Sequence, residues 1–553
     1  MKRNSSVFWI SPLLLGAVFC CFACGNGAAG PESEKPKADK SALTLLVGNA
    51  RALIAGVQTS ADGQDVPADE FWVSESVYNA LAQAIAAAEE ALPDDAATQE
   101  DIDRLRTVLQ TRMTAFTNAK KAGLYSPPPL LPQGLIPAGL GWARNSVNTT
   151  PFRQNSIVTH GNTQFIAYFD SNSRAIVGKR TLDQNEFTLT DTGITGWPSD
   201  AHNSICIMTD GDGYVHMVLG HHDSALSYYK SSAPLSTSFN PVTMLAKATY
   251  QDRVTYPEFY RLPSGDLLFV YRNGGSGNGE MVLNRYSTSA KTWSRVHDRL
   301  VYGTSGGVTQ SPYWQMYLDT GGTLHLSWVF RRSSDVATNH DMYYAYSEDQ
   351  GQTWKKKSDG LSYNMPITPN TAEKVWTIPE NSSLMNQTSM TADQAGNPYI
   401  ATYWKDSAPG SKTQYYVIYH DGTKWNARQV SNRTHDFTLG GGGTLFVPIA
   451  RPRLAAKYDA ASGKTRAYYI FRDTEEREGK VSMYRTADIE SGVWTVEDLT
   501  DFPVYAWEPS HDTELWKNQG KLHIFVQFAD QASNEGLTNH EPMMVYCLEA
   551  DVE

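Results

Sequence analysis

The sequence predicts a mainly β protein, a seven-bladed β-propeller preceded by a small α-helical bundle. A turn glycine followed by a short apolar strand recurs seven times, and repeats of this size are typical of propeller blades. Before these repeats the apolar residues follow a helical spacing of three and four, and a proline-rich stretch separates the two patterns. The repeat glycines are Gly161, Gly213, Gly265, Gly322, Gly396, Gly463 and Gly520.

The first residues have the pattern of a secretory signal. A basic start, Lys2-Arg3, precedes an apolar run at 7–23 that is too short and too rich in cysteine for a membrane span. The motif Ala23-Cys24-Gly25 resembles the processing site of bacterial lipoproteins, where the cysteine receives lipid. We therefore expect a lipoprotein signal peptide at 1–24, lipidation of Cys24, and an outer-membrane location in the cell envelope, facing the periplasm or outward. An ordinary cleaved signal is the alternative.

Residues 25–41 are polar and rich in Gly, Pro, Glu and Lys, which indicates a flexible tether. Residues 42–122 then predict a helical bundle, with a first helix near 43–57 and a second that begins after an N-cap at Ser74 and ends before Pro93. The helical spacing is carried by Val77, Leu81, Ile85, Ala88 and Leu92, and by Ile102, Leu105, Leu109, Met113 and Phe116. The pattern resembles FIVAR-type modules found beside carbohydrate-active domains; a simple spacer is the alternative.

Prolines at 127–129, with Pro132 and Pro137, predict a stiff linker at 123–139, so that the propeller occupies 140–553.

Inside the predicted propeller, the segment from Ser347 to Trp354 has the form S-x-D-x-G-x-T-W, an Asp-box turn. Asp349 is expected to bind local backbone N–H groups there, and Trp354 to anchor the turn. This motif indicates a propeller turn and carries no catalytic role. The run Gly440–Gly443 predicts a flexible loop, since it lacks the Lys and Ser/Thr of a phosphate-binding loop.

Composition limits the classes of partner. The net charge of −12 and the absence of a Lys/Arg run argue against nucleic acid, whereas the 11% of aromatic residues is compatible with carbohydrate stacked on ring faces. Cys206 and Cys547 lie in strand-like runs and are expected to be small buried hydrophobes, with a bridge between them left open. We expect a monomer that contacts a membrane only through the lipid.

Polar side chains stand at the ends of short apolar strands between residues 202 and 286, where a rigid sheet can aim them into one cleft. They are His202, His222, Tyr256 and Arg272. Their contexts, Ala201-His202-Asn203, Gly220-His221-His222-Asp223, Thr255-Tyr256-Pro257 and Tyr271-Arg272-Asn273-Gly274, resemble the BNR-repeat (BNR-4 type) propeller polysaccharide lyases of the ulvan-lyase kind. In that family His, His, Tyr and Arg line the cleft. The resemblance covers about residues 140–550.

This resemblance implies β-elimination on a uronic-acid-containing, ulvan-like polysaccharide of rhamnose and glucuronate. Such a lyase removes the proton at C5 and expels the oxygen at C4, so it needs a cation for the carboxylate, a base and an acid. Arg272 fits the cation, His202 or His222 the base, and Tyr256 a proton donor or acceptor. Which histidine acts as the base stays open.

Further polar residues at blade edges are expected to build substrate subsites. They are Tyr313, His340, Asn386, Gln387, Arg433, Arg451 and His511. No cofactor is required by the proposed chemistry. The metal assignment is unknown, because no Cys or His spacing of a structural zinc site occurs, and a structural Ca²⁺ or Zn²⁺ held across blades would not be visible in the sequence.

Three other functions share this fold. A glycoside hydrolase could cut the rhamnose–glucuronate linkage, a sialidase-like hydrolase could use the same frame, and a glycan-binding propeller would have no catalytic set. Sialidases usually carry several Asp boxes and an arginine triad, whereas one clear box occurs here. Fold alone does not choose among them.

Overall fold

The computed structural model describes residues 37–63, 66, 70–123, 134–150, 152–245, 250–387, 389–533 and 535–552. The chain divides into two compact units, Met1–Leu130 and Leu131–Glu553. The expected signal peptide with Cys24, most of the expected tether and the prolines at 127–129 lie outside the described residues. No helix in the described part of the chain is long and apolar enough to cross a membrane.

Three helices build the first unit: α1 (Ser41–Ile54), α2 (Glu75–Ala91) and α3 (Gln99–Ala119). Each buries one apolar stripe in a shared core that includes Leu43 and Val47 from α1, Leu81 and Ile85 from α2, and Leu109 and Phe116 from α3. Ser74 occupies the N-cap position of α2, but its side chain makes no capping hydrogen bond. Thr98 caps α3 instead, through a reciprocal pair of hydrogen bonds with Asp101.

A small sheet accompanies the helices and was not predicted from the sequence. It contains β1 (Val57–Thr59), β2 (Phe71–Val73) and β3 (Lys121–Ala122). The expected first helix therefore ends too late, because Val57 belongs to β1. Gly56 adopts a φ of +73° at this point, which ends the helical path.

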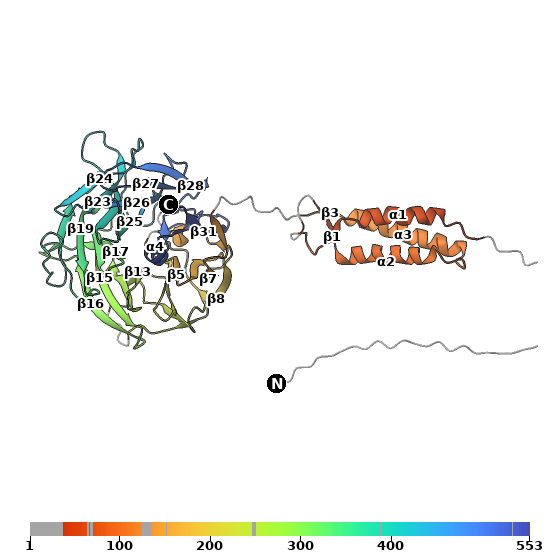
Figure 1. The fold of residues 1–553 in the computed structure, drawn as a ribbon, viewed down its shortest axis with the longest axis horizontal. Helices are drawn as coiled ribbons and strands as arrows, with labels where there is room; N and C mark the ends of the chain where they lie inside the picture. The colour runs from red at the N-terminus through yellow and green to blue at the C-terminus, as the bar shows by residue number, and fades with distance from the viewer. Residues whose placement is uncertain are drawn as a thin grey trace, which may run out of the picture. The chain divides into compact units, whose positions relative to one another are not determined.

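The second unit is mainly β and its described residues form seven four-stranded sheets arranged around a common centre (Figure 1). Three are formed by β5 (Ile157–His160), β6 (Thr163–Phe169), β7 (Arg174–Thr181) and β8 (Thr188–Thr195), by β9 (Ile205–Thr209), β10 (Val215–Leu219), β11 (Tyr228–Ser231) and β12 (Phe239–Pro241), and by β13 (Val254–Arg261), β14 (Leu267–Gly275), β15 (Asn278–Ser287) and β16 (Thr292–Tyr302).

Three more follow the same order. They are formed by β17 (Ser311–Leu318), β18 (Leu324–Arg331), β19 (Asn339–Ser347) and β20 (Glu373–Trp376), by β21 (Ser389–Ala392), β22 (Pro398–Lys405), β23 (Thr413–His420) and β24 (Trp425–Gln429), and by β25 (Arg453–Asp459), β26 (Lys464–Arg472), β27 (Lys480–Thr486) and β28 (Thr495–Pro503). The last sheet joins β29 (Ser510–His511), β30 (Leu522–Gln527) and β31 (Met543–Ala550) to β4 (Leu135–Gly141), with helix α4 (Thr513–Gln519) between β29 and β30.

All seven repeat glycines lie between the first and second strands of these sheets, and all have a positive φ, from +60° to +89°. This conformation costs glycine little and is unfavourable for other residues. Space imposes a second limit at Gly265, where an added Cβ would stand 2.7 Å from the Cα of Gly211. The recurring glycine therefore lies in the connection between the first two strands of each sheet, as the sequence repeat predicted.

Burial differs between the inner and outer strands of each sheet. Every residue of β17 and β18 is buried, because neighbouring sheets cover both faces, whereas the fourth strand β8 alternates between exposed and partly buried positions. The inner strands are therefore rigid, and they can hold the side chains at their ends in fixed orientations.

The last sheet corrects the predicted domain boundary. β4 pairs with β31, with Ile136 opposite Cys547, so the β unit begins at Leu135 and not at 140. The predicted linker 123–139 is therefore too long at its C-terminal end. Pro137, which the sequence predicts in the linker, belongs to β4. This is the edge strand of its sheet, where proline is tolerated because one row of N–H groups needs no partner.

The turn from Ser347 to Trp354 has the predicted geometry. Asp349 accepts hydrogen bonds from the backbone N–H and side chain of Thr353, Gly351 has a φ of +88°, and the Trp354 side chain is fully buried. Cys206 and Cys547 are both buried and unbridged, so the open question of a disulfide between them is answered in favour of two free thiols.

Candidate active site

One pocket of about 170 Å³ is lined by His202, His222, Tyr256 and Arg272 together. His202 precedes β9 and His222 follows β10, and these strands pair antiparallel with Ile205 opposite Leu219. The start of one strand therefore lies beside the end of the next, and the two imidazole rings stack with centroids 3.8 Å apart. The sheet pairing alone brings together two histidines that are twenty residues apart in the sequence.

Tyr256 and Arg272 are brought together in the same way. β13 and β14 pair with Thr255 opposite Arg272, and the Arg272 guanidinium lies 4.8 Å from the centre of the Tyr256 ring. Tyr256 also lies 4.9 Å from Phe152 and 5.8 Å from His202, measured between ring centres. Its hydroxyl is thus carried on a ring that is fixed on several sides.

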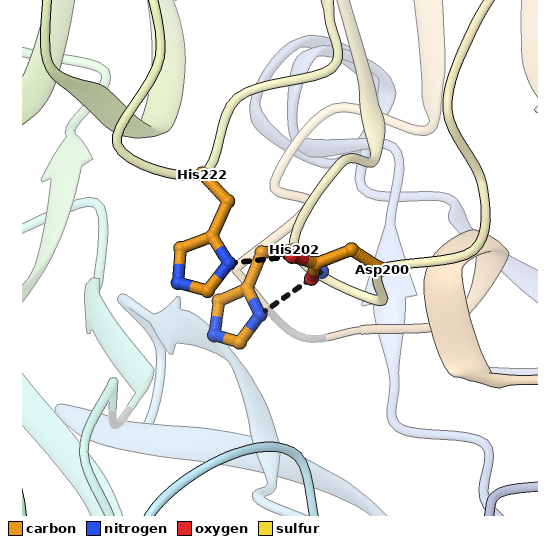
Figure 2. A group of neighbouring side chains, drawn as sticks. All are labelled: Asp200, His202 and His222. Atoms are coloured by element: carbon orange, nitrogen blue, oxygen red, sulfur yellow. Dashed lines mark hydrogen bonds and ion pairs between the residues drawn. The ribbon is translucent and has the colours of Figure 1, made fainter. Parts of the chain in front are cut away.

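Asp200 holds the two histidines in place. Its Oδ1 lies 2.9 Å from Nδ1 of His202 and its Oδ2 lies 2.6 Å from Nδ1 of His222 (Figure 2). Because an ionised carboxylate only accepts hydrogen bonds, each Nδ1 must carry a proton and each neutral ring keeps its lone pair on Nε2. In Figure 2 both of these second nitrogens point away from Asp200. The same three side chains place potential metal ligands within 4.8 Å of one another.

Burial and hydrogen bonding set the charge states of this group. Burial alone would raise the pKa of Asp200, but the hydrogen bonds from His202 and His222 outweigh it and lower that pKa well below its usual value. Burial lowers the pKa of His202, and its hydrogen bond to Asp200 offsets this only in part. His202 is therefore neutral at pH 7, with a carboxylate placed to stabilise the imidazolium that forms when Nε2 takes up a proton.

The backbone at Tyr256 is strained. Its φ is +57°, in the left-handed region that non-glycine residues rarely adopt, and the pairing of β13 with β14 shifts between Thr255 and Glu258. Such strain costs on the order of 1–3 kcal/mol and clusters at functional sites. The bulge turns the Tyr256 side chain into the pocket, where burial raises its pKa even though Arg272 is nearby.

Two arginines meet at the hydroxyl of Tyr313. Arg272 donates to this oxygen over 3.3 Å and Arg331 over 3.5 Å, and the Ser276 hydroxyl lies 2.9 Å away. Burial alone would raise the pKa of Tyr313, but the two cations outweigh it and lower that pKa. Arg272 also donates to the Gly274 carbonyl and Arg331 to the Ser334 carbonyl, and neither guanidinium forms an ion pair with a described carboxylate. The pocket therefore offers positive charge to an incoming anion.

A third arginine in the pocket lining is already neutralised. Arg451 forks onto Glu508, with Nε 2.9 Å from Oε1 and Nη2 2.5 Å from Oε2. Asn386 lines the pocket as well, whereas Gln387 lies behind it and accepts from Asn386 and Arg451. Of the predicted subsite residues, Tyr313, Asn386 and Arg451 therefore line the pocket and Gln387 supports it.

Three predicted subsite residues do not line the pocket. His340 is buried, with Nε2 3.0 Å from Gln310 and Nδ1 3.2 Å from Asp341. Arg433 is buried in ion pairs with Asp473 and Glu475. His511 is buried beside a separate small cavity, where burial and the nearby Arg453 lower its pKa to about 3. The prediction that these residues form subsites is not supported by their position, because a residue near the end of a strand can equally face the packing between sheets.

Sequence reasoning missed Asp200, Arg331, Arg472 and Glu535. Asp200 stands two residues before His202, a spacing at which a carboxylate can reach the ring. Arg331 and Arg472 line the pocket and each ends the second strand of its sheet after Phe, as Arg272 follows Tyr271 in the second strand of another sheet. This aromatic–arginine pattern could have been found, because equivalent strands of repeated sheets place their ends on the same side. Glu535 Oε1 lies 3.5 Å from Nδ1 of His202, and no local pattern indicates this contact.

Replacing Asp200 with Asn is expected to lower kcat/KM by about 10- to 100-fold, less than the loss of a general base itself. Without the carboxylate the imidazolium of His202 is less stable. Since the base must be neutral, the acid limb of the pH profile should move to lower pH. A matched control is Asp319→Asn, which removes the carboxylate of another buried Asp–His pair, Asp319–His325, outside the pocket lining. An unchanged pH profile in Asp200→Asn with normal melting would contradict this role.

Residues 163–433 match the BNR repeat-containing family (BNR_4). The chain is 32% identical over 127 residues to the long isoform of ulvan lyase from Glaciecola sp. (strain KUL10), covering 20% of this chain and 12% of that protein. It is 20% identical over 263 residues to the ulvan lyase of Nonlabens ulvanivorans, covering 42% of this chain and 55% of that protein. The chain thus spans about half or less of the length of these curated relatives.

Two solved structures share the fold. The polysaccharide lyase Uly1 superposes with a TM-score of 0.54 at 16% identity, covering 72% of this chain and 90% of that one. An ulvan lyase of polysaccharide lyase family PL25 gives a TM-score of 0.53 at 13% identity, covering 75% of this chain and 96% of that one, in a structure bound to -[GlcA(1-4)Rha3S]-. At these identities the similarity is one of fold.

Proposed function

We propose that this protein is a polysaccharide lyase that cleaves an ulvan-like, uronic-acid-containing polysaccharide by β-elimination. The observation that carries the proposal is the arrangement of His202 and His222 on one carboxylate, in the same pocket as Tyr256 and Arg272, an arginine with no described carboxylate partner. The resemblance to named ulvan lyases in sequence and fold supports it. The proposed reaction uses side chains alone.

In the proposed mechanism Arg272 binds the substrate carboxylate and stabilises the enolate-like state that forms when the C5 proton leaves. Nε2 of His202 accepts that proton, and Asp200 stabilises the resulting imidazolium. The C4–O4 bond breaks as the C4=C5 double bond forms, and the Tyr256 hydroxyl protonates the leaving oxygen. Solvent then removes the proton from His202 and restores the one on Tyr256, so protons and electrons balance.

The choice of His202 as the base rests on its surroundings. It lies between Phe152 and His222, with ring centres 5.4 Å and 3.8 Å away, and its side chain is 13% exposed against 34% for His222. A buried imidazole is kept neutral, and it loses no hydration when substrate enters. Tyr256, whose pKa is raised, stays protonated and is suited to be the donor.

The hydrolase alternatives differ in what they need. A glycoside hydrolase that uses two carboxyl groups lacks them here, because Glu508 is the one carboxylate among the described lining residues and both of its oxygens bind Arg451. A sialidase-like hydrolase is the second candidate. It is favoured by Tyr313, which has a lowered pKa between two arginines and could act as a nucleophile.

We also infer that the seven sheets close into a seven-bladed propeller. The inference is supported by β4, which completes the sheet of β29 to β31 and so joins the two ends of the β unit. In this arrangement the strand ends that carry the four candidate catalytic residues meet above the ring centre.

The deciding experiment incubates the purified protein with a panel of uronic-acid polysaccharides and follows ultraviolet absorbance together with reducing ends. We expect absorbance and reducing ends to rise in step, because β-elimination creates a conjugated C4=C5 double bond at each cut. New reducing ends without absorbance would identify a hydrolase, and binding with neither signal would identify a glycan-binding protein. The variant His202→Ala, which we expect to be inactive, is incubated in parallel to correct for changes in absorbance that do not come from elimination.

A further inference from the structure

The pocket is closed on one side by a segment that we call the strap, residues 437–447. The strap lies between β24 and β25, contains no helix or strand, and contributes Leu439 and residues 442–447 to the pocket lining. It includes the glycine run 440–443, which the sequence presents as a flexible loop. In the structure this run is held at defined points.

The strap is anchored at two places in different sheets. The backbone N–H of Gly441 donates to Asp335 over 2.7 Å, and the Gly441 carbonyl accepts from Val336 over 2.8 Å, in the loop between β18 and β19. The backbone N–H and the hydroxyl of Thr444 both donate to Glu535 over 2.7 Å, in the loop between β30 and β31. The strap therefore connects the loops of two sheets that lie three apart in the ring.

Apolar packing adds to these anchors. Val336, Leu439 and Val447 form a small buried cluster with exposures of 5%, 8% and 7%. Within the strap, Phe446 stacks on Tyr505 with ring centres 4.4 Å apart and lies against the Arg472 guanidinium. Moving the strap away would break these four hydrogen bonds, and the one that the Ser383 hydroxyl donates to the Phe437 carbonyl, and would expose this apolar surface, so the closed position is the stable one.

The pocket lining at His222 is exposed to solvent. The His222 side chain is 34% exposed, and beside it the ion pair of Asp223 with Arg253 is 38% and 51% exposed. On the strap side, Arg472 and Asn386 are 2% and 7% exposed. We place the entrance on the side of His222, so that a sugar chain that enters there meets the strap.

We propose, on the basis of the proposed lyase function, that this enzyme acts at the end of a polysaccharide chain and does not cut within it. A chain cut in its middle must continue past the reacting bond in both directions, and the strap blocks one of them. The volume of about 170 Å³ is small beside the roughly 300–1,000 Å³ of pockets that hold a drug-sized ligand. It fits a short terminal sugar unit. The preferred substrates are therefore short uronic-acid oligosaccharides and chain ends.

The test compares absorbance, viscosity and product size during digestion of one uronic-acid polysaccharide and of the oligosaccharides derived from it. For the natural protein we expect absorbance to rise while viscosity stays nearly constant, with one small unsaturated product from the earliest time. A rapid fall in viscosity with a ladder of sizes would overturn the inference while leaving the lyase function intact. No absorbance on polymer or oligosaccharide would overturn both.

A variant tests the role of the strap itself. Asp335→Ala combined with Thr444→Ala removes side-chain anchors at both ends, and we expect a faster fall in viscosity for the same absorbance and the appearance of longer products. Asp421→Ala is the matched control, since it removes another carboxylate that binds backbone N–H groups, in the hairpin of β23 and β24 outside the pocket lining. An unchanged product profile in a double variant that melts normally would show that the strap does not limit cutting to chain ends.

Discussion

Tyr256→Phe is expected to reduce kcat by about 10²- to 10⁴-fold and to leave the melting temperature nearly unchanged. The substitution removes one hydroxyl, which has no hydrogen-bond partner among the described residues, and keeps the ring that packs against Phe152, Tyr313 and Arg272. It also keeps the strained backbone, since Phe meets the same steric limits at φ +57°. The loss would therefore report the proton that the hydroxyl supplies.

The control for this variant is Tyr346→Phe, which removes the hydroxyl of a partly buried tyrosine on β19 outside the pocket lining. Both variants should give circular dichroism spectra and melting curves like those of the natural protein. Full activity in Tyr256→Phe would exclude the donor role and would shift attention to Tyr313, which lies 6.0 Å from it between ring centres.

Arg272→Lys is expected to lower kcat by at least about 10²-fold while changing KM much less. The guanidinium donates through Nε to the Gly274 carbonyl over 3.0 Å and through Nη1 to Tyr313. These bonds fix the orientation of the planar group, which can then face a carboxylate with two parallel donors. Lysine keeps the charge and loses both the fork and its orientation. The effect should therefore be largest in the transition state, where charge on the carboxylate increases.

Arg285→Lys is the matched control, because Arg285 lies outside the pocket lining and donates through Nε and Nη2 to Oδ2 of Asp266, over 3.2 Å and 2.7 Å. It should cost a little stability, within about 1 kcal/mol for a partly exposed pair, and no activity. A rise in KM with unchanged kcat in Arg272→Lys would mean that Arg272 binds substrate and transition state equally.

The number and order of the sheets could be predicted from the sequence because the connection between the first two strands of each sheet has the same conformational requirement. Gly265 and its six counterparts need a positive φ, and few residues other than glycine meet that need, so the requirement leaves a visible repeat. No comparable sequence pattern marks the start of the β unit at Leu135. Pro137 looks like a linker residue by itself, and only the pairing of β4 with a strand at the far end of the chain gives it another meaning.

The candidate site was predictable where neighbouring strands of one sheet carry its residues. His202 with His222, and Tyr256 with Arg272, face each other because antiparallel pairing places them side by side. Contacts between sheets were not predictable. Arg433 resembles a free cation in the sequence, yet its partner Asp473 directly follows β26 of another sheet. Glu535 contacts His202 from the loop between β30 and β31.

The pairing of β4 with β31 has a consequence for how the protein matures. Gly141 and Met543 lie opposite each other although roughly 400 residues separate them in the sequence, so this contact closes the longest loop of the β unit and must form late in folding. Glu535 belongs to the same final stretch and contacts both the strap and His202. A nascent chain that has made the first six sheets therefore still lacks a complete site, and activity appears only when the C-terminal strands have been synthesised and docked.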